Sequence, residues 1–250
     1  MMKSLPKLIF VCGLFSLTNH VVTKAQTQSS ACPPAEKSIH LLWVSSLTGC
    51  PFSAVIDIGR TQTLADGSHI QTKTKDLVYR DSLGRIRYEM YGPPVIDKSS
   101  PEAPTIVRIY DPVAGFEYVL QPQSAIAYRN SLNEPTTSQR AGAKPQLSSA
   151  QASASPPRPK ITVEKLEPQQ MEGLLVTGRR TTRTIPAGAE GNDQALTIVS
   201  ESWISSDMGI TLLEKTSDPR SGDSERRITN LEQSEPDAAL FQVPAEYTIK

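Results

Sequence analysis

The feature that most constrains this chain is a two-residue alternation of apolar and other side chains, repeated in short stretches between turns. It begins at Phe52 and continues through Ala54, Ile56 and Ile58. That period places one side of an extended strand in a core and the other toward solvent. The Asp66-Gly67 pair then supplies a tight turn, and the chain returns through residues 70–81. The pattern predicts a β-hairpin.

More short strands follow this hairpin. After a turn at residues 82–84, Ile86, Tyr88 and Met90 face one way along residues 85–91. A Pro-rich connection from Gly92 to Pro104 leads to three predicted strands, at 105–112, 116–122 and 125–130. Strands joined by turns this short must pair antiparallel, because a parallel partner needs a longer crossover.

The composition changes between residues 131 and 160, where Pro, Ser, Ala and Gln dominate and large apolar side chains are almost missing. Such a segment cannot bury enough surface to offset the entropy lost on ordering. We therefore predict a disordered linker at 131–160, which either separates two domains or interrupts one sheet. We favour one β domain whose halves are residues 52–130 and 161–250.

The second half has the same character as the first. Strands are predicted at 161–168, 174–186, 195–204, 209–219 and 225–233. Near the end, Ser234 is a candidate cap for a short helical turn that carries Ala238 to Phe241. The predicted fold class is mainly β with minor helix, arranged as a curved antiparallel sheet or unclosed barrel. A sandwich whose two halves fill each other is the alternative.

The N-terminus has the pattern of a secretory signal peptide. Lys3 and Lys7 precede an apolar run from Leu8 to Leu17, and cleavage after Ala25 fits the small residues there. The run is too short to span a bilayer, and no later segment is long enough, so the mature chain is predicted to have no transmembrane helix. We expect a signal peptide at 1–25, a leader at 26–51, and export to the periplasm or the medium.

Two cysteines remain after removal of residues 1–25. Cys32 and Cys50 are compatible with one disulfide in an oxidising compartment, although sequence alone does not decide the pairing. The competing interpretation is lipidation at either cysteine. Leu47 to Cys50 resembles a lipobox but lies far from the start, and Cys32 lacks a preceding apolar run, so lipoprotein anchoring is not expected.

The charge balance limits the class of partner. The whole chain has 26 basic and 26 acidic residues, and removal of residues 1–25 takes away three lysines and no acids. The mature chain is therefore slightly acidic. Nucleic acids and anionic membrane surfaces demand clustered positive charge, so neither is expected as the main partner.

Catalytic motifs are missing from the sequence. Only His40 and His69 remain in the mature chain, and no nucleophile elbow, phosphate-binding loop, HExxH, CxxC or EF-hand pattern occurs. No cofactor is therefore predicted. A hydrolase built on scattered carboxylates stays open as the least favoured hypothesis, because such enzymes need no local motif.

Three polar clusters have simpler structural explanations. Asp218 and Arg220 suit a turn between strands, although they also juxtapose a carboxylate and a guanidinium. The Arg- and Thr-rich stretch 177–184 suits a solvated strand, although it also has the groups to hold an anion. Residues 188–193 have the composition of a calcium loop without its spacing, which favours a long hairpin turn.

Several segments together resemble known secreted proteins. They are residues 51–70, YRDSLGRIRYEMY, IYDPVAG, TGRRTTRTIPAGAEGND, SDPRSG and LFQVPAEYT. They look like a group of uncharacterised secreted proteins of soil bacteria of the acidobacterial type. More remotely, the hairpin-rich layout with its closing LFQVP resembles the periplasmic lipoprotein-carrier superfamily (LolA/LolB-like) and related envelope-stress sensor domains. That resemblance implies an unclosed β barrel, with helices in its concavity, that holds acyl chains or apolar peptide segments. No ligand-contacting residue of the carriers matches a position here.

Two function classes follow from these observations. The first is a non-enzymatic envelope protein that binds an apolar ligand, such as a lipid or a lipoprotein acyl chain, on the inner face of its sheet. The second is an interaction module that engages another envelope protein through strand edges or the linker. The side chains predicted to line an apolar site are Ile56, Ile86, Tyr88, Met90, Phe116 and Tyr118.

Overall fold

A computed structural model describes residues 32–33, 43–92, 103–132 and 158–250. The first group of strands is β1 (Phe52–Thr63), β2 (His69–Arg80), β3 (Ile86–Met90), β4 (Ile106–Asp111), β5 (Phe116–Gln121) and β6 (Ile126–Ser131). The second is β7 (Lys160–Met171), β8 (Leu174–Ile185), β9 (Leu196–Ser205), β10 (Ile210–Asp218), β11 (Gly222–Glu232) and β12 (Thr248–Ile249). Two short 3-10 turns are η1 (Pro122–Ser124) and η3 (Ala238–Phe241).

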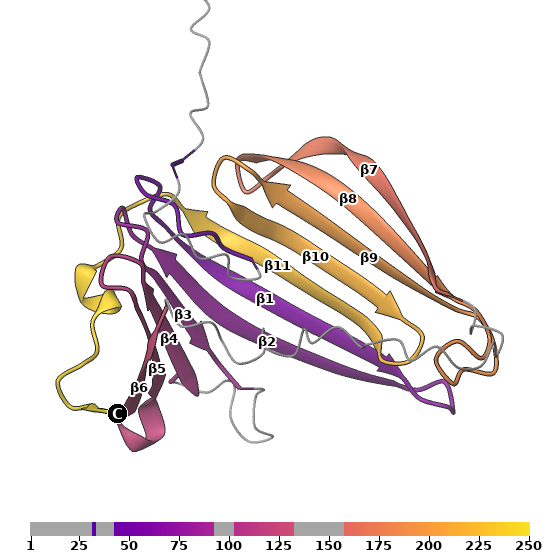
Figure 1. The fold of residues 1–250 in the computed structure, drawn as a ribbon, viewed down its shortest axis with the longest axis horizontal. Coiled ribbons are helices and arrows are strands. Elements are labelled where there is room, and N and C mark those ends of the chain that lie inside the picture. The colour runs from indigo at the N-terminus through magenta and orange to yellow at the C-terminus, as the bar shows by residue number, and fades with distance from the viewer. Residues whose placement is uncertain (1–31, 34–42, 93–102, 133–157) are drawn as a thin grey trace, which may run out of the picture.

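The described strands form one sheet in the order β12-β6-β5-β4-β3-β2-β1-β11-β10-β9-β8-β7 (Figure 1). All neighbours pair antiparallel except β12 and β6, which are parallel. Because β1 pairs with both β2 and β11, strands from the two halves of the sequence meet at the centre of the sheet. The prediction of a mainly β fold with one unclosed, largely antiparallel sheet is confirmed.

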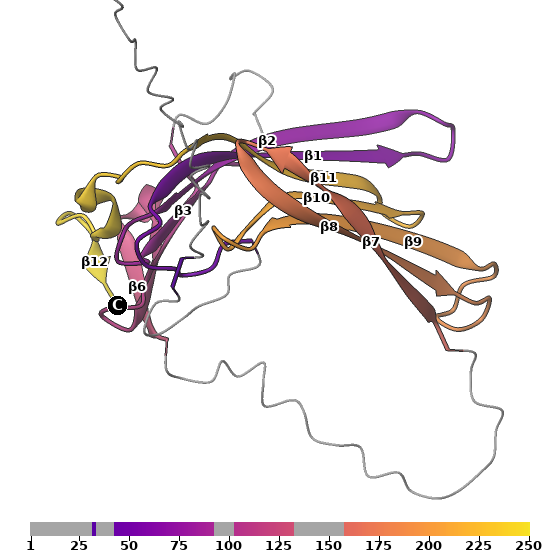
Figure 2. The ribbon, with the colours of Figure 1, turned by 90° about the horizontal axis from the view of Figure 1, so that it is seen from above.

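The sheet is strongly curved. Seen from above, β3 to β6 turn away from the plane of the long strands, which run side by side from β2 to β7 (Figure 2). Irregularities in register occur between Ser53 and Val55, between Thr211 and Leu213, and between Leu166 and Gln169. Pro168 lies in the last of these, on an edge strand, where its missing N–H is tolerated.

The sheet has two faces with separate cores. The first face carries Phe52, Ile56, Val78 and Ile86, all fully buried in the larger cluster. The second face of β4 to β6 carries the smaller cluster of Val107, Ile109, Leu120 and Ala127 together with Phe241 of η3. The alternation of side chains along each strand explains the division. Ile109 pairs with Arg87 and points to the second face with it, whereas the preceding residue, Ile86, points to the first face.

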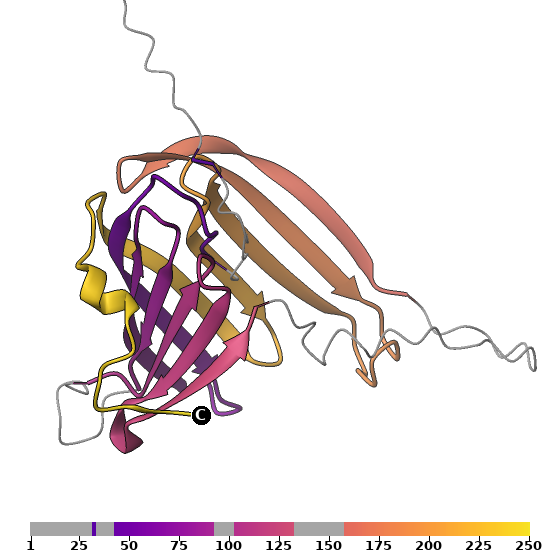
Figure 3. The same ribbon diagram turned by 60° about the vertical axis from the view of Figure 1, so that its left-hand side comes forward.

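The C-terminal segment covers the second face of β3 to β6, and η3 lies beside these strands (Figure 3). Arg87 Nη1 donates to the Leu240 carbonyl oxygen at 2.9 Å. The prediction that Ser234 caps this turn is wrong. Asp237 is the cap, its Oδ1 accepting from Ala239 N at 2.9 Å. Pro236 separates Ser234 from the turn, which begins only at residue 238.

Several predictions concern residues that the structure does not describe. The proposed signal peptide and most of the leader fall outside the described residues, as does most of the predicted linker at 131–160. The described end of the predicted leader, residues 43–50, is part of the domain. Val44, Ser46 and Leu47 are buried there.

Candidate ligand-binding site

A pocket of about 390 Å³ lies on the first face of the sheet, partly covered by the segment 43–50. We call it the first-face pocket. Its lining residues come from that segment and from five strands: Trp43, Val44, Ile56, Asp76, Val78, Ile86, Tyr88, Met90, Arg108, Tyr110 and Arg226. The volume falls within the range of about 300–1,000 Å³ that is usual for small-molecule sites.

Strand alternation builds the wall of this pocket. Ile56 of β1 pairs with Asp76 of β2 and with Ile228 of β11, so these side chains share the first face. Tyr88 of β3 pairs with Val78 on one side and with Arg108 on the other. Directly paired residues in an antiparallel sheet point to the same face, which is why the lining residues converge.

The segment 43–50 is tied to the sheet at several points. Thr211 N donates to the Trp43 carbonyl oxygen and Ser45 N to that of Gly209, both at 2.8 Å. A disulfide joins Cys32 to Cys50, with 6.0 Å between their Cα atoms. The cover of the pocket is therefore fixed by contacts with the loop between β9 and β10 and with the first residues of β10.

Arg80 is the central anchor of this segment. Its side chain is fully buried and lies over the ring of Phe52. Its Nε donates to the Cys50 carbonyl oxygen at 2.8 Å, and its Nη1 to those of Ser45 (2.9 Å) and Met208 (2.8 Å). Burial lowers the pKa of Arg80 to about 10, so it stays charged at neutral pH.

Trp43 covers one end of the pocket. Its ring stacks on Tyr88 with 6.2 Å between ring centroids, and its Nε1 donates to Glu214 Oε2 at 3.0 Å. The guanidinium of Arg226 lies over the same ring. A tryptophan held between an aromatic ring and a cation has a defined position.

Polar groups are embedded in the apolar wall. Asp76 is almost fully buried and accepts hydrogen bonds from Tyr88 Oη at 2.6 Å and Tyr91 N at 3.0 Å. Burial raises the pKa of the Tyr88 phenol well above its usual value, and Asp76 raises it further. Arg108 Nη2 forms an ion pair with Glu117 at 2.8 Å. The pocket thus combines apolar surface with a few placed polar groups.

The structure brings together four of the six predicted lining residues. Ile56, Ile86, Tyr88 and Met90 all line the first-face pocket. Phe116 and Tyr118 do not, and their predicted place beside the other four is corrected. Tyr118 pairs with Ile109, so it lies on the second face with that core.

Sequence reasoning missed the other seven lining residues, which are Trp43, Val44, Asp76, Val78, Arg108, Tyr110 and Arg226. A signal existed for Arg226, because it precedes Ile228 by two residues and therefore shares its face. Trp43 and Val44 lie in the predicted leader, residues 26–51. No local pattern shows that these residues fold onto strands more than 150 residues away.

A second, larger hollow of about 1170 Å³ lies on the second face of the long strands. Its lining mixes both signs of charge, including Asp57 with Lys75 (3.6 Å) and Glu225 with Arg227 (2.9 Å). Most of its charged groups satisfy one another. We regard the smaller first-face pocket as the better site for an apolar ligand, because most of its lining side chains are apolar or aromatic.

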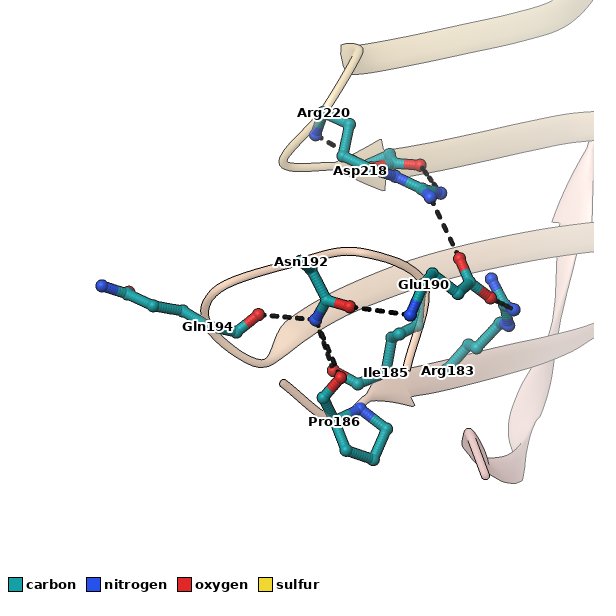
Figure 4. Close-up of polar contacts among 8 residues, drawn as sticks. All are labelled: Arg183, Ile185, Pro186, Glu190, Asn192, Gln194, Asp218 and Arg220. Atoms are coloured by element: carbon teal, nitrogen blue, oxygen red, sulfur yellow. Dashed lines mark hydrogen bonds and ion pairs between the residues drawn. The ribbon is translucent and has the colours of Figure 1, made fainter. Parts of the chain in front are cut away.

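The three polar clusters seen in the sequence meet at the far ends of the long strands (Figure 4). Arg220 Nη2 forms an ion pair with Asp218 Oδ2 at 2.8 Å, and Glu190 bridges Arg183 and Arg220. Asn192 Nδ2 donates to the carbonyl oxygens of Pro186 and Gln194, closing the β8–β9 turn. These contacts stabilise two neighbouring hairpin tips.

The residues that the structure describes hold no cluster of metal-binding side chains. Among them, no three His, Cys, Asp or Glu side chains gather closely enough to hold a metal ion. Within the same residues, no helix has the length and apolar character needed to cross a membrane.

No protein-family model and no curated protein sequence matches this chain. Similar solved structures include an uncharacterized conserved protein from Thermus thermophilus, with 8% identity over 80% of this chain and 90% of that one (TM-score 0.42). MucB in complex with MucA(peri) has 11% identity over 79% and 55% (TM-score 0.37). A LolA superfamily protein from Nitrosomonas europaea has 11% identity over 77% and 90% (TM-score 0.29).

These likenesses include the superfamily that the sequence remotely resembles. Their TM-scores are too low to carry an argument about the ligand or partners of this chain.

Proposed function

We propose that this protein is a non-enzymatic binding protein that holds an apolar ligand, a lipid or an acyl chain, in the first-face pocket. The observation that carries the proposal is the pocket itself. The partly exposed Trp43, Tyr88 and Met90 present apolar surface to the pocket, and the buried Ile56, Val78 and Ile86 lie behind them. An apolar cavity of this size is an energetically favourable place for a hydrophobic guest.

The cover supports the same proposal. The disulfide between Cys32 and Cys50, together with the three carbonyl contacts of Arg80, holds the segment in place before any ligand arrives. A preformed site loses less conformational entropy on binding than one that must be ordered.

A fluorescent fatty acid tests this function. We expect saturable binding to the purified, lipid-stripped protein, and recovery of lipid from the untreated protein by organic extraction. Met90→Glu should weaken binding because it places a charge in the pocket wall. Ile161→Glu, at an exposed position of β7, is the matched control and should leave binding unchanged. Absence of any probe binding by the folded protein would rule the proposal out.

Export is the second part of the proposal and rests on the sequence of residues 1–25. The disulfide is consistent with an oxidising compartment. Intact-mass measurement of the protein recovered from a bacterial periplasm or medium should match a chain that begins at Gln26. A retained N-terminus, or a lipid adduct on Cys32 or Cys50, would contradict it.

The edge strand β7 favours a second candidate function, protein–protein interaction. β7 pairs only with β8 among the described strands, and its Ile161 and Val163 side chains are about 60% exposed. An exposed strand edge can accept another extended chain. A cross-linked partner that is captured from cell extract by the wild type and lost when the edge of β7 is altered would favour this alternative. If no such partner is captured and the protein binds a lipid, this alternative is ruled out.

A further inference from the structure

Two arginines line the first-face pocket with a buried nitrogen that lacks a hydrogen-bond partner among the described residues, but Arg108 forms an ion pair with Glu117, whereas Arg226 forms none. It lies on β11, paired with Ile58 of β1 and Glu214 of β10, and it lines the pocket beneath the Trp43 ring. Its Nη1 is buried and has no hydrogen-bond partner among the described residues. A guanidinium donor hidden from water without an acceptor is costly, so natural structures usually supply one.

The neighbouring carboxylates are committed elsewhere. Glu214 accepts the Trp43 indole N–H, and Asp76 accepts from Tyr88 Oη and Tyr91 N. Burial lowers the pKa of the Arg226 guanidinium, and the negative charges of Glu214 and Asp76 oppose this shift by favouring its charged form. Arg226 is therefore held as a cation inside the pocket, with a hydrogen-bond donor to spare.

The adjacent arginine shows the contrast. Arg227 projects to the second face, where its Nε donates to Glu225 Oε1 at 3.0 Å and its Nη2 lies 2.9 Å from the same oxygen. Two consecutive arginines of one strand thus differ in a single respect that matters here. Arg227, on the second face, forms an ion pair with Glu225. Arg226, in the first-face pocket, has no carboxylate paired with it among the described residues.

We propose that Arg226 binds the anionic head group of the ligand, so that the pocket selects a single-chain amphiphile with a carboxylate over a neutral lipid. This inference rests on the proposed function. The apolar chain would lie against Trp43, Tyr88 and Met90, which are partly exposed and share the pocket with Arg226. A hydrogen bond between a guanidinium and a carboxylate is among the stronger polar contacts in proteins.

The size of the pocket limits the chain. About 390 Å³ corresponds to roughly thirteen water molecules at about 30 Å³ each. That space suits one acyl chain of medium length and is small for a lipid with two long chains. Dodecanoate is therefore a suitable probe.

The test compares three probes of equal chain length at neutral pH: dodecanoate, 1-dodecanol and dodecyltrimethylammonium. We expect the lipid-stripped wild-type protein to bind dodecanoate about tenfold or more tightly than dodecanol, and the cation most weakly. Arg226→Met should abolish this preference, so that the variant binds dodecanoate no more tightly than dodecanol. Arg227→Met, on the opposite face of the same strand, should change neither affinity.

The outcomes separate the two proposals. Equal binding of dodecanoate and dodecanol by the wild type would overturn the role of Arg226 while the apolar site stands. A folded Arg226→Met protein that keeps the preference for dodecanoate would also overturn it. If no probe binds to the folded wild-type protein, the proposed function fails as well. The wild-type comparison needs no variant, so the test holds even if Arg226→Met does not fold.

Discussion

Arg80 Nη1 donates a hydrogen bond to the Ser45 carbonyl oxygen at 2.9 Å, and this contact joins the end of β2 to the segment that covers the first-face pocket. The same guanidinium also reaches the carbonyl oxygens of Cys50 and Met208. Three chain segments that are remote in sequence therefore meet at one buried cation. The cover and the sheet should lose stability together when this cation is removed.

Arg80→Met should lower the free energy of unfolding by about 3 kcal/mol or more, because three buried carbonyl groups lose their donor. Urea unfolding followed by circular dichroism measures this change. Arg60→Met removes an exposed arginine from β1 and should have an effect within about 0.5 kcal/mol. Equal effects of the two substitutions would show that Arg80 is not an anchor.

Gly178 should be intolerant of even a methyl group. A Cβ at this position would lie 2.6 Å from Cζ3 of Trp203, which covers the glycine from the neighbouring strand. We expect Gly178→Ala to destabilise the protein by about 1–3 kcal/mol through overpacking. Gly59→Ala is the matched control, since a Cβ there meets nothing within 4 Å. A neutral Gly178→Ala would contradict the close packing of Trp203.

Tyr88 should make the protein less stable at alkaline pH. Burial and the nearby Asp76 raise the pKa of Tyr88 in the folded state, whereas in the unfolded chain it ionises near pH 10. Above about pH 10 the unfolded state loses this proton first, so the free energy of unfolding falls as the pH rises. One such group contributes a slope of up to about 1.4 kcal/mol per pH unit.

Tyr88→Phe should make that decline less steep between about pH 10 and 11.5. Chemical unfolding at a series of pH values gives both slopes, and the two proteins should have parallel curves below about pH 9. Tyr91, whose pKa is raised to about 12 by burial and Glu89, keeps part of the slope in the variant. An unchanged slope would mean that Tyr88 is not buried beside Asp76.

Limited proteolysis tests the predicted disorder of residues 131–160. Trypsin should cut after Arg140 before it attacks any strand, because the composition there disfavours an ordered chain. The two fragments should still elute as one species in gel filtration, since β1 pairs with β11 across the cut. Separate elution of folded fragments would show that the halves are independent domains.

The sequence allowed the fold class to be predicted well because strand alternation and tight turns are local signals. Ile56, Ile86, Tyr88 and Met90 share a face because each strand keeps its two-residue period between short turns. The prediction put Phe116 and Tyr118 on the wrong face. A long connection separates β3 from β4, and the alternation of side chains cannot be followed from one strand to the next across it. The face of the later strands is set only by pairing, such as that of Tyr88 with Arg108.

The covers of both faces depend on contacts that no local pattern reveals. Trp43 meets Tyr88 and Glu214, and Phe241 packs against Ile109 and Leu120. An apolar residue in a polar segment can be expected to be buried. The sequence does not show which part of the fold it packs against. The pocket itself results from these long-range contacts, so its position could not be derived from the sequence.

The emission of Trp43 tests the central claim most directly. The chain has two tryptophans, so Trp203→Phe leaves only Trp43, at the end of the first-face pocket. A brominated fatty acid bound there should quench this emission saturably, and unlabelled dodecanoate should restore it. In Trp43→Phe, the remaining Trp203 emission should not respond. Emission from Trp43 that is unaffected at saturating brominated ligand would contradict the existence of an acyl-chain site in this pocket.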